Sequence, residues 1–269
     1  MLKNRLIPII AFKNDRVVQS FNFERFLPIG NVKTAIEFFV NWDVDEIIII
    51  DIDATRNKRQ PRTDIIEFAS KECFVPLTYG GGINSIDHVK QILRVGCDKI
   101  CINSITLEQN DFIKKSSFLF GKQCITVSID VKKIGDEYYV FTSNGKINTN
   151  KNVADWAKIV EEQGAGEILI KSIDHDGSRK GYDLDLLRLV SSSVSVPVIA
   201  SSGVGTVKHL ADGILKGGCQ AVSASNIFHH TEHSTIAAKS YLSKQGIPIR
   251  LDSDVKYNNF DFDETFRPI

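Results

Sequence analysis

Two similar stretches of the sequence differ at a position suited to acid–base chemistry. The first, RLIPIIAFKND at residues 5–15, and the second, TVSIDVKK at residues 126–133, both run from apolar residues into a polar loop. The second places Asp130 where the first has Ala11. A carboxylate at a strand end can transfer a proton during a reaction, and a methyl group cannot. If the two stretches are halves of one site, Asp130 is the acid of one half and Ala11 leaves the other half without one. A structural role for Asp130 in capping the next loop is the alternative.

Glycine, hydroxyl and amide residues follow four other apolar runs. They are GGG at residues 80–82, NS at 103–104, GVG at 203–205 and SN at 225–226. Glycine lets backbone N–H groups approach an anion closely, and a helix N-terminus behind it adds a favourable partial charge. One such turn alone is equally well explained by tight chain reversal. Because the arrangement occurs twice, it predicts two phosphate sites, suited to an elongated ligand with a phosphate at each end.

The elements that must position these residues alternate between short β-branched runs and longer segments of helical period. Strand followed by helix, repeated, indicates parallel pairing through right-handed crossovers. Eight such units in a chain of this length predict an α/β fold, a closed (β/α)₈ TIM barrel. An open doubly wound sheet is the alternative, but the first run is not followed by G-x-G-x-x-G. The predicted strands span residues 6–10, 46–50, 75–79, 99–103, 126–129, 167–170, 197–200 and 221–225, and the helices include 33–42, 85–95, 152–163 and 183–189.

An internal repeat divides the predicted barrel into two halves. DIDA at residue 51 aligns with SIDH at 172, VPLTYGGG at 75 with VPVIASSG at 196, and GCDKICIN at 96 with GCQAVSAS at 218. The common offset is 121 or 122 residues, close to the 119 that separate Ala11 from Asp130. We therefore expect a single barrel over residues 1–251, built from half-barrels 1–120 and 121–251, followed by an extension at 252–269.

Composition limits the classes of partner. The chain of 269 residues is 42% hydrophobic and has 33 basic and 33 acidic residues, so no charge excess points to nucleic acid or to a membrane. The five cysteines form no C-x-x-C pair, which disfavours disulfides and zinc. His229 and His233 are four residues apart, but no third ligand at a recognised spacing supports a metal site. Lacking a signal-like segment or a membrane-length apolar run, the chain is expected to be cytoplasmic, with no metal and no cofactor.

Across residues 1–251 the sequence resembles the HisF family, the cyclase (synthase) subunit of imidazole glycerol phosphate synthase. The resemblance implies a (β/α)₈ barrel that receives ammonia from a glutaminase (HisH-like) subunit. That family joins the ammonia to a phosphoribosyl-linked aminoimidazole carboxamide (PRFAR), releasing imidazole glycerol phosphate and AICAR. The segments that carry the resemblance are RLIP at 5–8, RVV at 16–18, GGGI at 80–83, DK at 98–99, Asn103, SID at 128–130, GAGE at 164–167, SIDHDG at 172–177 and GYD at 181–183.

The resemblance also implies roles for individual residues. Asp130 falls on a catalytic aspartate of the family, and the ligand is expected to be a phosphorylated small molecule. For Asp51 and Asp176 a purely structural role in their loops is as good an explanation as ligand contact. The expected substrate- and phosphate-binding residues are Asp51, Gly81, Gly82, Asn103, Ser104, Asp176, Gly177, Gly203, Ser225 and Asn226.

A second group of residues begins four of the strands. Arg5, Glu46, Lys99 and Glu167 match the salt-bridged ammonia gate at the glutaminase-facing end of the family's barrel. Such a ring of charges could instead be a structural plug, because that end of a barrel generally serves stability. The chain has no convincing glutamine-hydrolysing set of its own. A glutaminase partner is therefore expected to supply ammonia.

Three positions depart from the family pattern. Ala11 replaces a second catalytic aspartate, Gln19 a loop lysine and Lys171 a threonine. The loss of one acid predicts a poor cyclase and favours a branch that supplies ammonia to a sugar amidotransferase making acetamidino sugars for bacterial surfaces. Three alternatives remain: a true cyclase, a sister isomerase, which normally also uses two strand-end aspartates, and a non-catalytic scaffold. The extension at 252–269 is expected to pack on its own barrel, with partner docking as the alternative.

Overall fold

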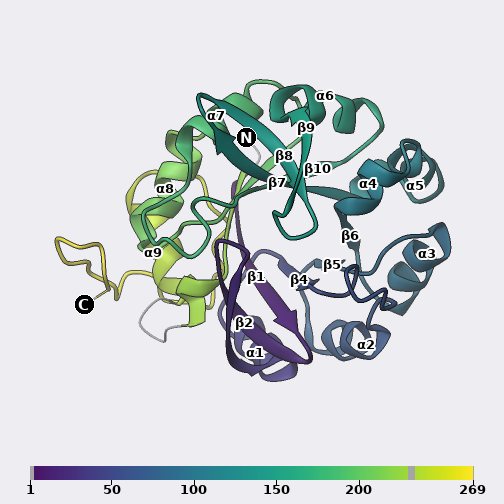
Figure 1. Ribbon diagram of the computed structural model, residues 1–269. Helices are drawn as coiled ribbons and strands as arrows, with labels where there is room; N and C mark the ends of the chain where they lie inside the picture. The colour runs from purple at the N-terminus through teal and green to yellow at the C-terminus, as the bar shows by residue number, and fades with distance from the viewer. Residues whose placement is uncertain (1–2, 230–233, 269) are drawn as a thin grey trace.

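The computed structural model, which describes residues 3–229 and 234–268, is a closed parallel barrel surrounded by helices (Figure 1). Neighbouring strands follow the chain order around the barrel, and pairing of β7 with β10 and of β12 with β1 completes the circle. This confirms the predicted (β/α)₈ TIM barrel. The barrel strands are β1 (Arg5–Lys13), β4 (Ile47–Asp51), β5 (Leu77–Gly80), β6 (Lys99–Ile102), β7 (Ile125–Ile134), β10 (Glu167–Ser172), β11 (Val198–Ser201) and β12 (Ala221–Ala224).

Helices connect the strands and bury their apolar faces against the outside of the barrel. The four predicted helices are confirmed, and three of them begin one residue later than predicted because Ser85, Asn152 and Asp183 are N-caps whose side chains accept a helix N–H. The helices are α1 (Val32–Val40), α2 (Thr63–Glu72), α3 (Ile86–Val95), α4 (Ser104–Glu108), α5 (Phe112–Phe120), α6 (Val153–Glu162), α7 (Leu184–Ser191), α8 (Val207–Leu215) and α9 (Thr235–Lys244), with short 3₁₀ turns η1 (Lys122–Cys124) and η2 (Asn226–His229).

Two hairpins extend the barrel and were not expected from the sequence. Strands β2 (Arg16–Phe21) and β3 (Arg25–Asn31) continue β1, and β8 (Glu137–Thr142) and β9 (Ile147–Asn152) continue β7, all by antiparallel pairing. Left-handed backbone at Asn14 and Asp15, and at Gly135, forms the first turn of each hairpin. These turns carry β1 and β7 beyond the predicted strands at 6–10 and 126–129.

The internal repeat is visible in the backbone. Both hairpins leave the barrel at corresponding strands, and the loops after β5 and β11 adopt the same left-handed conformation at two successive residues. In the first loop these are Gly81 and Gly82, with φ of 109° and 71°, and in the second Ser202 and Gly203, with φ of 76° and 95°. A non-glycine residue rarely takes this conformation. Its retention at Ser202 shows that the loop geometry itself is repeated.

Side chains that point into the barrel lie in layers. Along β10, Glu167, Leu169 and Lys171 alternate with residues that face the helices, as the two-residue period of a strand requires. The base of the barrel is charged, the mouth is polar, and a separate apolar cluster fills the middle. That cluster consists of Ile7, Ile9, Ile48, Cys101, Leu169, Ile199 and Ala221, with Ile50 packed against it.

The C-terminal extension packs on its own barrel. Asn4 bridges to Ile249 beside the first strand, and Phe262 and Phe266 lie edge-on to Tyr241 of α9 at centroid distances of 5.2 and 6.1 Å. Lys244 pairs with Asp261 at 3.2 Å. Among the described residues no helix is long and apolar enough to cross a bilayer.

Candidate functional site

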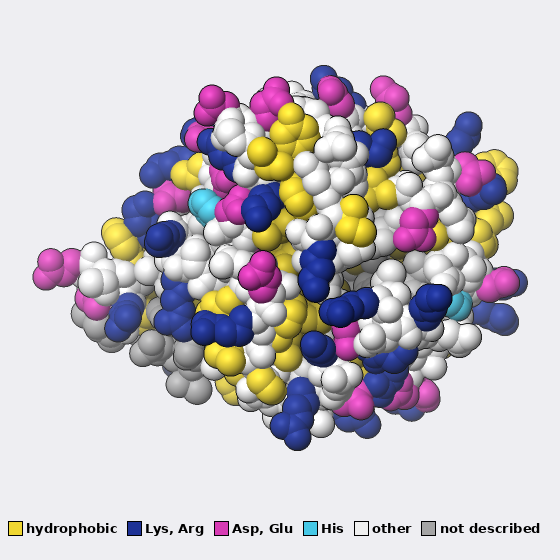
Figure 2. All heavy atoms as spheres, in the orientation of Figure 1, with side chains coloured by type: hydrophobic (Ala, Val, Ile, Leu, Met, Phe, Trp, Pro, Cys, Tyr) yellow, Lys and Arg dark blue, Asp and Glu magenta, His cyan; other side chains and the backbone are white. Residues whose placement is uncertain are grey.

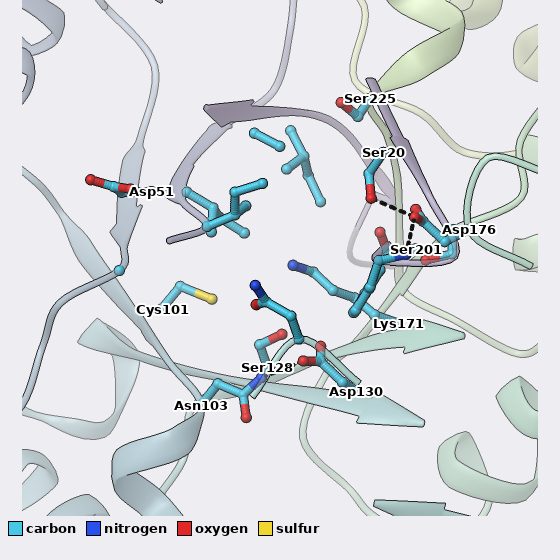
Figure 3. Close-up of a pocket in the computed structure, with 18 of the residues that line it drawn as sticks. Ser20, Asp51, Cys101, Asn103, Ser128, Asp130, Lys171, Asp176, Ser201 and Ser225 are labelled. Carbon is cyan, nitrogen blue, oxygen red and sulfur yellow. Dashed lines mark hydrogen bonds between the residues drawn. The ribbon is translucent and has the colours of Figure 1, made fainter. Parts of the chain in front are cut away.

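A pocket of about 350 Å³ opens at the carboxyl ends of the barrel strands (Figure 3). This volume lies at the lower end of the range typical of small-molecule sites. The pocket brings together every residue that the sequence predicts for catalysis and ligand binding. They are Asp51, Gly81, Gly82, Asn103, Ser104, Asp130, Asp176, Gly177, Gly203, Ser225 and Asn226.

Asp130 lies in the wall of this pocket at the end of the barrel part of β7. Its Oδ2 accepts a hydrogen bond from Asn103 Nδ2 at 2.8 Å, while its Oδ1 is buried without a hydrogen-bond partner among the described residues. Burial raises the pKa of Asp130, and nearby Lys171 and the bond from Asn103 oppose that shift. The carboxyl group thus has an open acceptor or donor position and a bias toward its protonated form, both of which suit proton transfer.

The equivalent place in the first half of the barrel is apolar. Ala11 pairs with Ile50 between β1 and β4, as Asp130 pairs with Lys171 between β7 and β10. Ala11 and Ile50 both line the pocket. The wall opposite the Asp130 side therefore has no ionisable group at these two positions.

Lys171 occupies the middle of the mouth. In Figure 3 its side chain reaches into the pocket beside Asp130, and its charge acts on the pKa values of Asp130, Asp176 and Cys101. Within the described chain no residue forms a hydrogen bond or an ion pair with the Lys171 ammonium group. This half-buried cation is therefore available to a ligand.

The first predicted phosphate site lies at the ends of β5 and β6. Gly81 and Gly82 form its left-handed turn, and Asn103 and Ser104 begin α4 beside it. Thr142, on the β8–β9 hairpin, donates to Ser104 Oγ at 3.1 Å. The hairpin of the second half is thus hydrogen-bonded to the predicted phosphate site of the first.

The second predicted phosphate site lies at the ends of β11 and β12. Gly203 supplies the left-handed turn, and Ser225 and Asn226 lead into η2, the kind of short extra helix that commonly binds phosphate in TIM barrels. The Ser225 hydroxyl is buried with no hydrogen-bond partner in the described part of the chain. An unsatisfied buried hydroxyl costs about 1–3 kcal/mol unless a ligand or water completes it. Ser225 is accordingly suited to bind an anionic oxygen.

Asp176 and Gly177 hold the β2–β3 hairpin against the mouth. Asp176 Oδ2 accepts hydrogen bonds from Ser20 Oγ at 2.6 Å and from the Phe23 N–H at 3.2 Å (Figure 3). A side chain at Gly177 would collide with the Ser20 carbonyl, 2.5 Å away. The carboxylate of Asp176 therefore positions the hairpin, and a phosphate bound nearby would rely on other groups.

Asp51 lines the pocket, but its carboxylate points away from the central group of side chains (Figure 3). Its Oδ1 accepts a hydrogen bond from Arg59 at 3.0 Å, and Arg59 also pairs with Asp53. Burial and the neighbouring Asp53 raise the pKa of Asp51 to about 6. Asp51 Oδ2 has no hydrogen-bond partner among the described residues, but neither Asp51 nor Asp53 lies at the position equivalent to Ala11.

Basic side chains surround the mouth. Lys and Arg gather around a hollow at the centre of the face shown in Figure 2. The pocket lining itself includes Arg56, Lys171 and Arg179. The overall charge balance of the chain therefore conceals a local cationic site suited to an anionic ligand.

The opposite end of the barrel carries a closed ring of four alternating charges. Arg5 contacts Glu46 at 2.9 Å and Glu167 at 2.6 Å, and Lys99 contacts the same two carboxylates at 2.9 and 2.8 Å. Thr78 donates a further hydrogen bond to Glu46 at 2.9 Å. Burial alone would raise the pKa of Glu167, but Arg5 and Lys99 lower it below its ordinary value. The structure thus brings all four predicted gate residues together around the barrel axis, with the apolar cluster between them and the mouth.

Exposed aromatic side chains lie at the same end of the barrel as this ring. Phe74, 93% exposed, lies between the end of α2 and the start of β5, and Phe118, 88% exposed, lies in the last turn of α5 before β7. Helix ends and strand starts share the base of a (β/α)₈ barrel. Large apolar residues this exposed are typical of contact surfaces.

The cysteines offer no nucleophile for glutamine hydrolysis. Cys97, Cys101 and Cys219 are buried, and burial raises the pKa of Cys101 and of Cys219 to about 12. No cluster of three potential metal ligands occurs among residues 3–229 and 234–268. His229 packs against Phe39 at 6.1 Å, whereas His233 lies outside the described residues.

Comparison with known proteins identifies the family. A model of the family described as "Histidine biosynthesis protein" matches residues 5–234. The chain belongs to the HisF family. It is 54% identical over 268 residues to the putative imidazole glycerol phosphate synthase subunit hisF2 of Vibrio vulnificus, covering all of this chain and 98% of that protein. It is 41% identical over 251 residues to the imidazole glycerol phosphate synthase subunits HisF of Chlorobium phaeovibrioides and Chlorobium limicola, covering 93% of this chain and all of each relative. The alignments with the two Chlorobium proteins therefore leave part of this chain unmatched, whereas the alignment with the Vibrio protein matches the chain over its full length.

Several residues of the mouth were not predicted from the sequence. The two hairpins contribute Ser20, Phe23, Phe26, Ser143 and Asn144 to its lining. Their strands carry few of the alternating apolar residues by which strands are recognised, since β3 and β9 are largely exposed. The turn residues at 14–15 and 135–136 were the available signal.

Proposed function

We propose that this HisF-type barrel is the synthase-side subunit of a glutamine amidotransferase and receives ammonia through its base from a docked HisH-like glutaminase. The ring of Arg5, Glu46, Lys99 and Glu167 carries this proposal. It lies on the same barrel axis as a cationic, phosphate-suited mouth, and an apolar layer separates the two. A neutral molecule such as ammonia crosses an apolar layer far more readily than an ion does.

Docking of the glutaminase is proposed at the base of the barrel. Phe74 and Phe118 are apolar anchors beside the charged ring, and aromatic residues of this kind dominate many protein interfaces. A partner is needed because the described cysteines lack the exposed, low-pKa setting of a glutamine-hydrolysing nucleophile. The names of the Chlorobium relatives, each a subunit of a synthase, agree with an assembly of more than one chain.

The chemistry at the mouth is proposed to differ from efficient imidazole glycerol phosphate formation. Asp130 has the setting of a proton-transfer group, but Ala11 supplies no second acid and Asp51 is held by Arg59. Loss of one acid or base typically lowers a rate by about 100- to 10,000-fold. Ammonia that reaches this mouth is better used by another enzyme, and we favour a sugar amidotransferase that makes an acetamidino-modified bacterial surface sugar.

A histidine-pathway cyclase is the second candidate. The names of the relatives favour it, and the mouth contains Asp130 together with both predicted phosphate sites. In that case Asp130 would make the proton transfers without an opposed carboxylate.

Turnover of PRFAR with ammonium separates the two candidates. The wild-type chain is expected to form imidazole glycerol phosphate slowly, and Ala11→Asp is expected to raise the rate by about 100-fold or more. Ala11→Asn is the matched control, since it adds the same bulk without an acid. Wild-type turnover as fast as that of the Ala11→Asp variant would establish the cyclase and exclude the sugar-linked role as the main function.

A further inference from the structure

The mouth of the barrel has a reactive side and an inert side. The neighbouring pair Asp130 and Lys171 and the neighbouring pair Ala11 and Ile50 occupy corresponding positions of the two half-barrels. The first pair combines an acid with a cation, and the second offers only hydrocarbon. At these two pairs of positions, a ligand lying across the mouth therefore meets polar groups on one side and hydrocarbon on the other.

Several polar atoms on the side of Asp130 and Lys171 lack a partner within the described chain. Asp130 Oδ1 and Ser128 Oγ, both on β7, are buried without a hydrogen bond. No hydrogen bond or ion pair joins Lys171 Nζ to another described residue. Buried polar groups in proteins are nearly always satisfied, so exceptions that face a pocket indicate a position completed by ligand or water. Asn103 Nδ2 donates to the other carboxyl oxygen at 2.8 Å, so Oδ1 is the oxygen of Asp130 that a ligand or water would complete.

The predicted phosphate sites lie on either side of this pair. The turn at Gly81 and Gly82 is at one edge of the pocket, and Gly203 with Ser225 is at another. Lys171 is on the strand between Asp130 and Ser201 in the barrel order, and its side chain reaches the centre of the mouth (Figure 3). It is thus suited to the middle of a ligand whose ends occupy the two turns.

We propose that Lys171 is a specificity-determining residue that, together with Asp130, binds a carbonyl or enolate oxygen in the middle of an open-chain, bisphosphorylated ligand. The ammonium group supplies the positive charge, and the carboxyl group binds the same oxygen or an adjacent hydroxyl. Ile50 and Ala11 contact the opposite, apolar edge of the ligand. This inference rests on the proposed function because it takes the two glycine turns to be phosphate sites.

A comparison of two ligands isolates the contribution of Lys171. Ribulose bisphosphate has two terminal phosphates with a carbonyl at C2 and hydroxyl groups at C3 and C4 between them, whereas pentanediol bisphosphate has the phosphates alone. Titration calorimetry on the whole chain is expected to show that Lys171→Met weakens ribulose bisphosphate binding by about 10- to 100-fold, the range for a charge-assisted hydrogen bond. The same variant should weaken pentanediol bisphosphate binding by less than about 3-fold. The attraction between the Lys171 charge and the more distant phosphates is small in water.

Two further variants control for charge and folding. Lys171→Arg keeps the cation and is expected to recover most of the affinity for ribulose bisphosphate. Lys132→Met removes one exposed positive charge from the same strand as Asp130 and should affect both ligands little. Circular dichroism and the thermal midpoint establish that each variant is folded.

The outcomes are distinguishable. If Lys171→Met weakened the binding of both ligands by the same factor, the inference would be overturned. The lysine would then attract the phosphates only through its charge and would not bind the carbonyl oxygen. Failure of the wild-type chain to bind either ligand would also overturn it, by removing the ligand class. Glutaminase binding at the barrel base does not depend on ligand binding at the mouth. A wild-type chain that fails to bind the glutaminase would therefore count against the proposed function and not against this inference.

Discussion

Asp130 and Lys171 are direct neighbours between β7 and β10, at the register position that Ala11 and Ile50 occupy in the other half of the barrel. Two halves that share strands, hairpins and loop conformations have therefore diverged at the positions where chemistry occurs. The two halves share this frame of strands and hairpins, but they differ at the base as well as at the mouth, since Lys99 of the base ring aligns with Ala221 in the second half.

Asp130 is expected to reduce the stability of the fold at neutral pH. Burial raises its folded-state pKa above the unfolded value of about 4, so the folded state binds a proton more tightly. The stabilising effect of that proton is complete below about pH 4 and is lost as the pH rises through the folded-state pKa. The free energy of unfolding of Asp130→Asn at pH 7 should therefore be about 1–3 kcal/mol larger than that of wild type. Urea titrations at pH 7 and pH 4 should show this difference narrowing at the lower pH; a constant difference would contradict the account.

Lys239 is expected to be essential for the stability of the base. It is fully buried on α9 and binds Asp43 at 3.1 Å and Asp45 at 2.9 Å. Lys239→Met leaves two carboxylates without their cation, which should cost about 3–5 kcal/mol of unfolding free energy. Tyr257 of the C-terminal extension donates to Asp43, so Tyr257→Phe should cost only about 0.5–1.5 kcal/mol.

The half-exposed Lys244 provides the control for Lys239. Lys244→Met removes an exposed ion pair and is expected to cost less than about 1 kcal/mol. Urea unfolding measures all three variants. Similar losses in Lys239→Met and Lys244→Met would show that the buried network contributes little.

Ser225 is expected to contribute one neutral hydrogen bond to phosphate. Removing its unsatisfied hydroxyl in Ser225→Ala should weaken inorganic phosphate binding by about 2- to 10-fold while leaving the fold intact. Ser192→Ala, on an exposed helix end, is the matched control. Phosphorus NMR titration measures both affinities, and unchanged binding in Ser225→Ala would remove Ser225 from the site.

The charged ring is expected to affect ammonia from glutamine and ammonia from solution differently. In an Ala11→Asp background, imidazole glycerol phosphate formation serves as the readout. Adding Glu167→Gln removes one carboxylate shared by Arg5 and Lys99 and should lower glutamine-driven turnover with the glutaminase by about 10-fold. Ammonium-driven turnover should change by less than about 2-fold, because dissolved ammonia can enter at the mouth. Equal losses in both assays would make the ring a structural plug.

The barrel could be predicted from the sequence because its strands and helices carry regular apolar periods and because the repeat fixes their equivalence. The base ring was predictable from the resemblance to the HisF family, whose gate its four residues match, and the structure places Arg5 and Glu46 in contact. Packing over the mouth was not predictable. For Asp176 the sequence left ligand contact and a structural role equally open, and the structure shows that its carboxylate binds the β2–β3 hairpin through Ser20, a contact between residues 156 positions apart. Likewise, Lys171 is available to a ligand because no acidic side chain of the described chain reaches its ammonium group. No local sequence pattern could have predicted this.

Complex formation with a HisH-type glutaminase from the same genome tests the central claim most directly. Sedimentation of equimolar mixtures is expected to show a one-to-one complex with wild-type chain and none, at the same micromolar concentration, with a Phe74→Asp, Phe118→Asp double variant. A Leu27→Asp variant, exposed on β3 at the mouth, should bind like wild type. No complex with the wild-type chain, or a complex that the double variant leaves unchanged, would contradict ammonia entry through the base of this barrel.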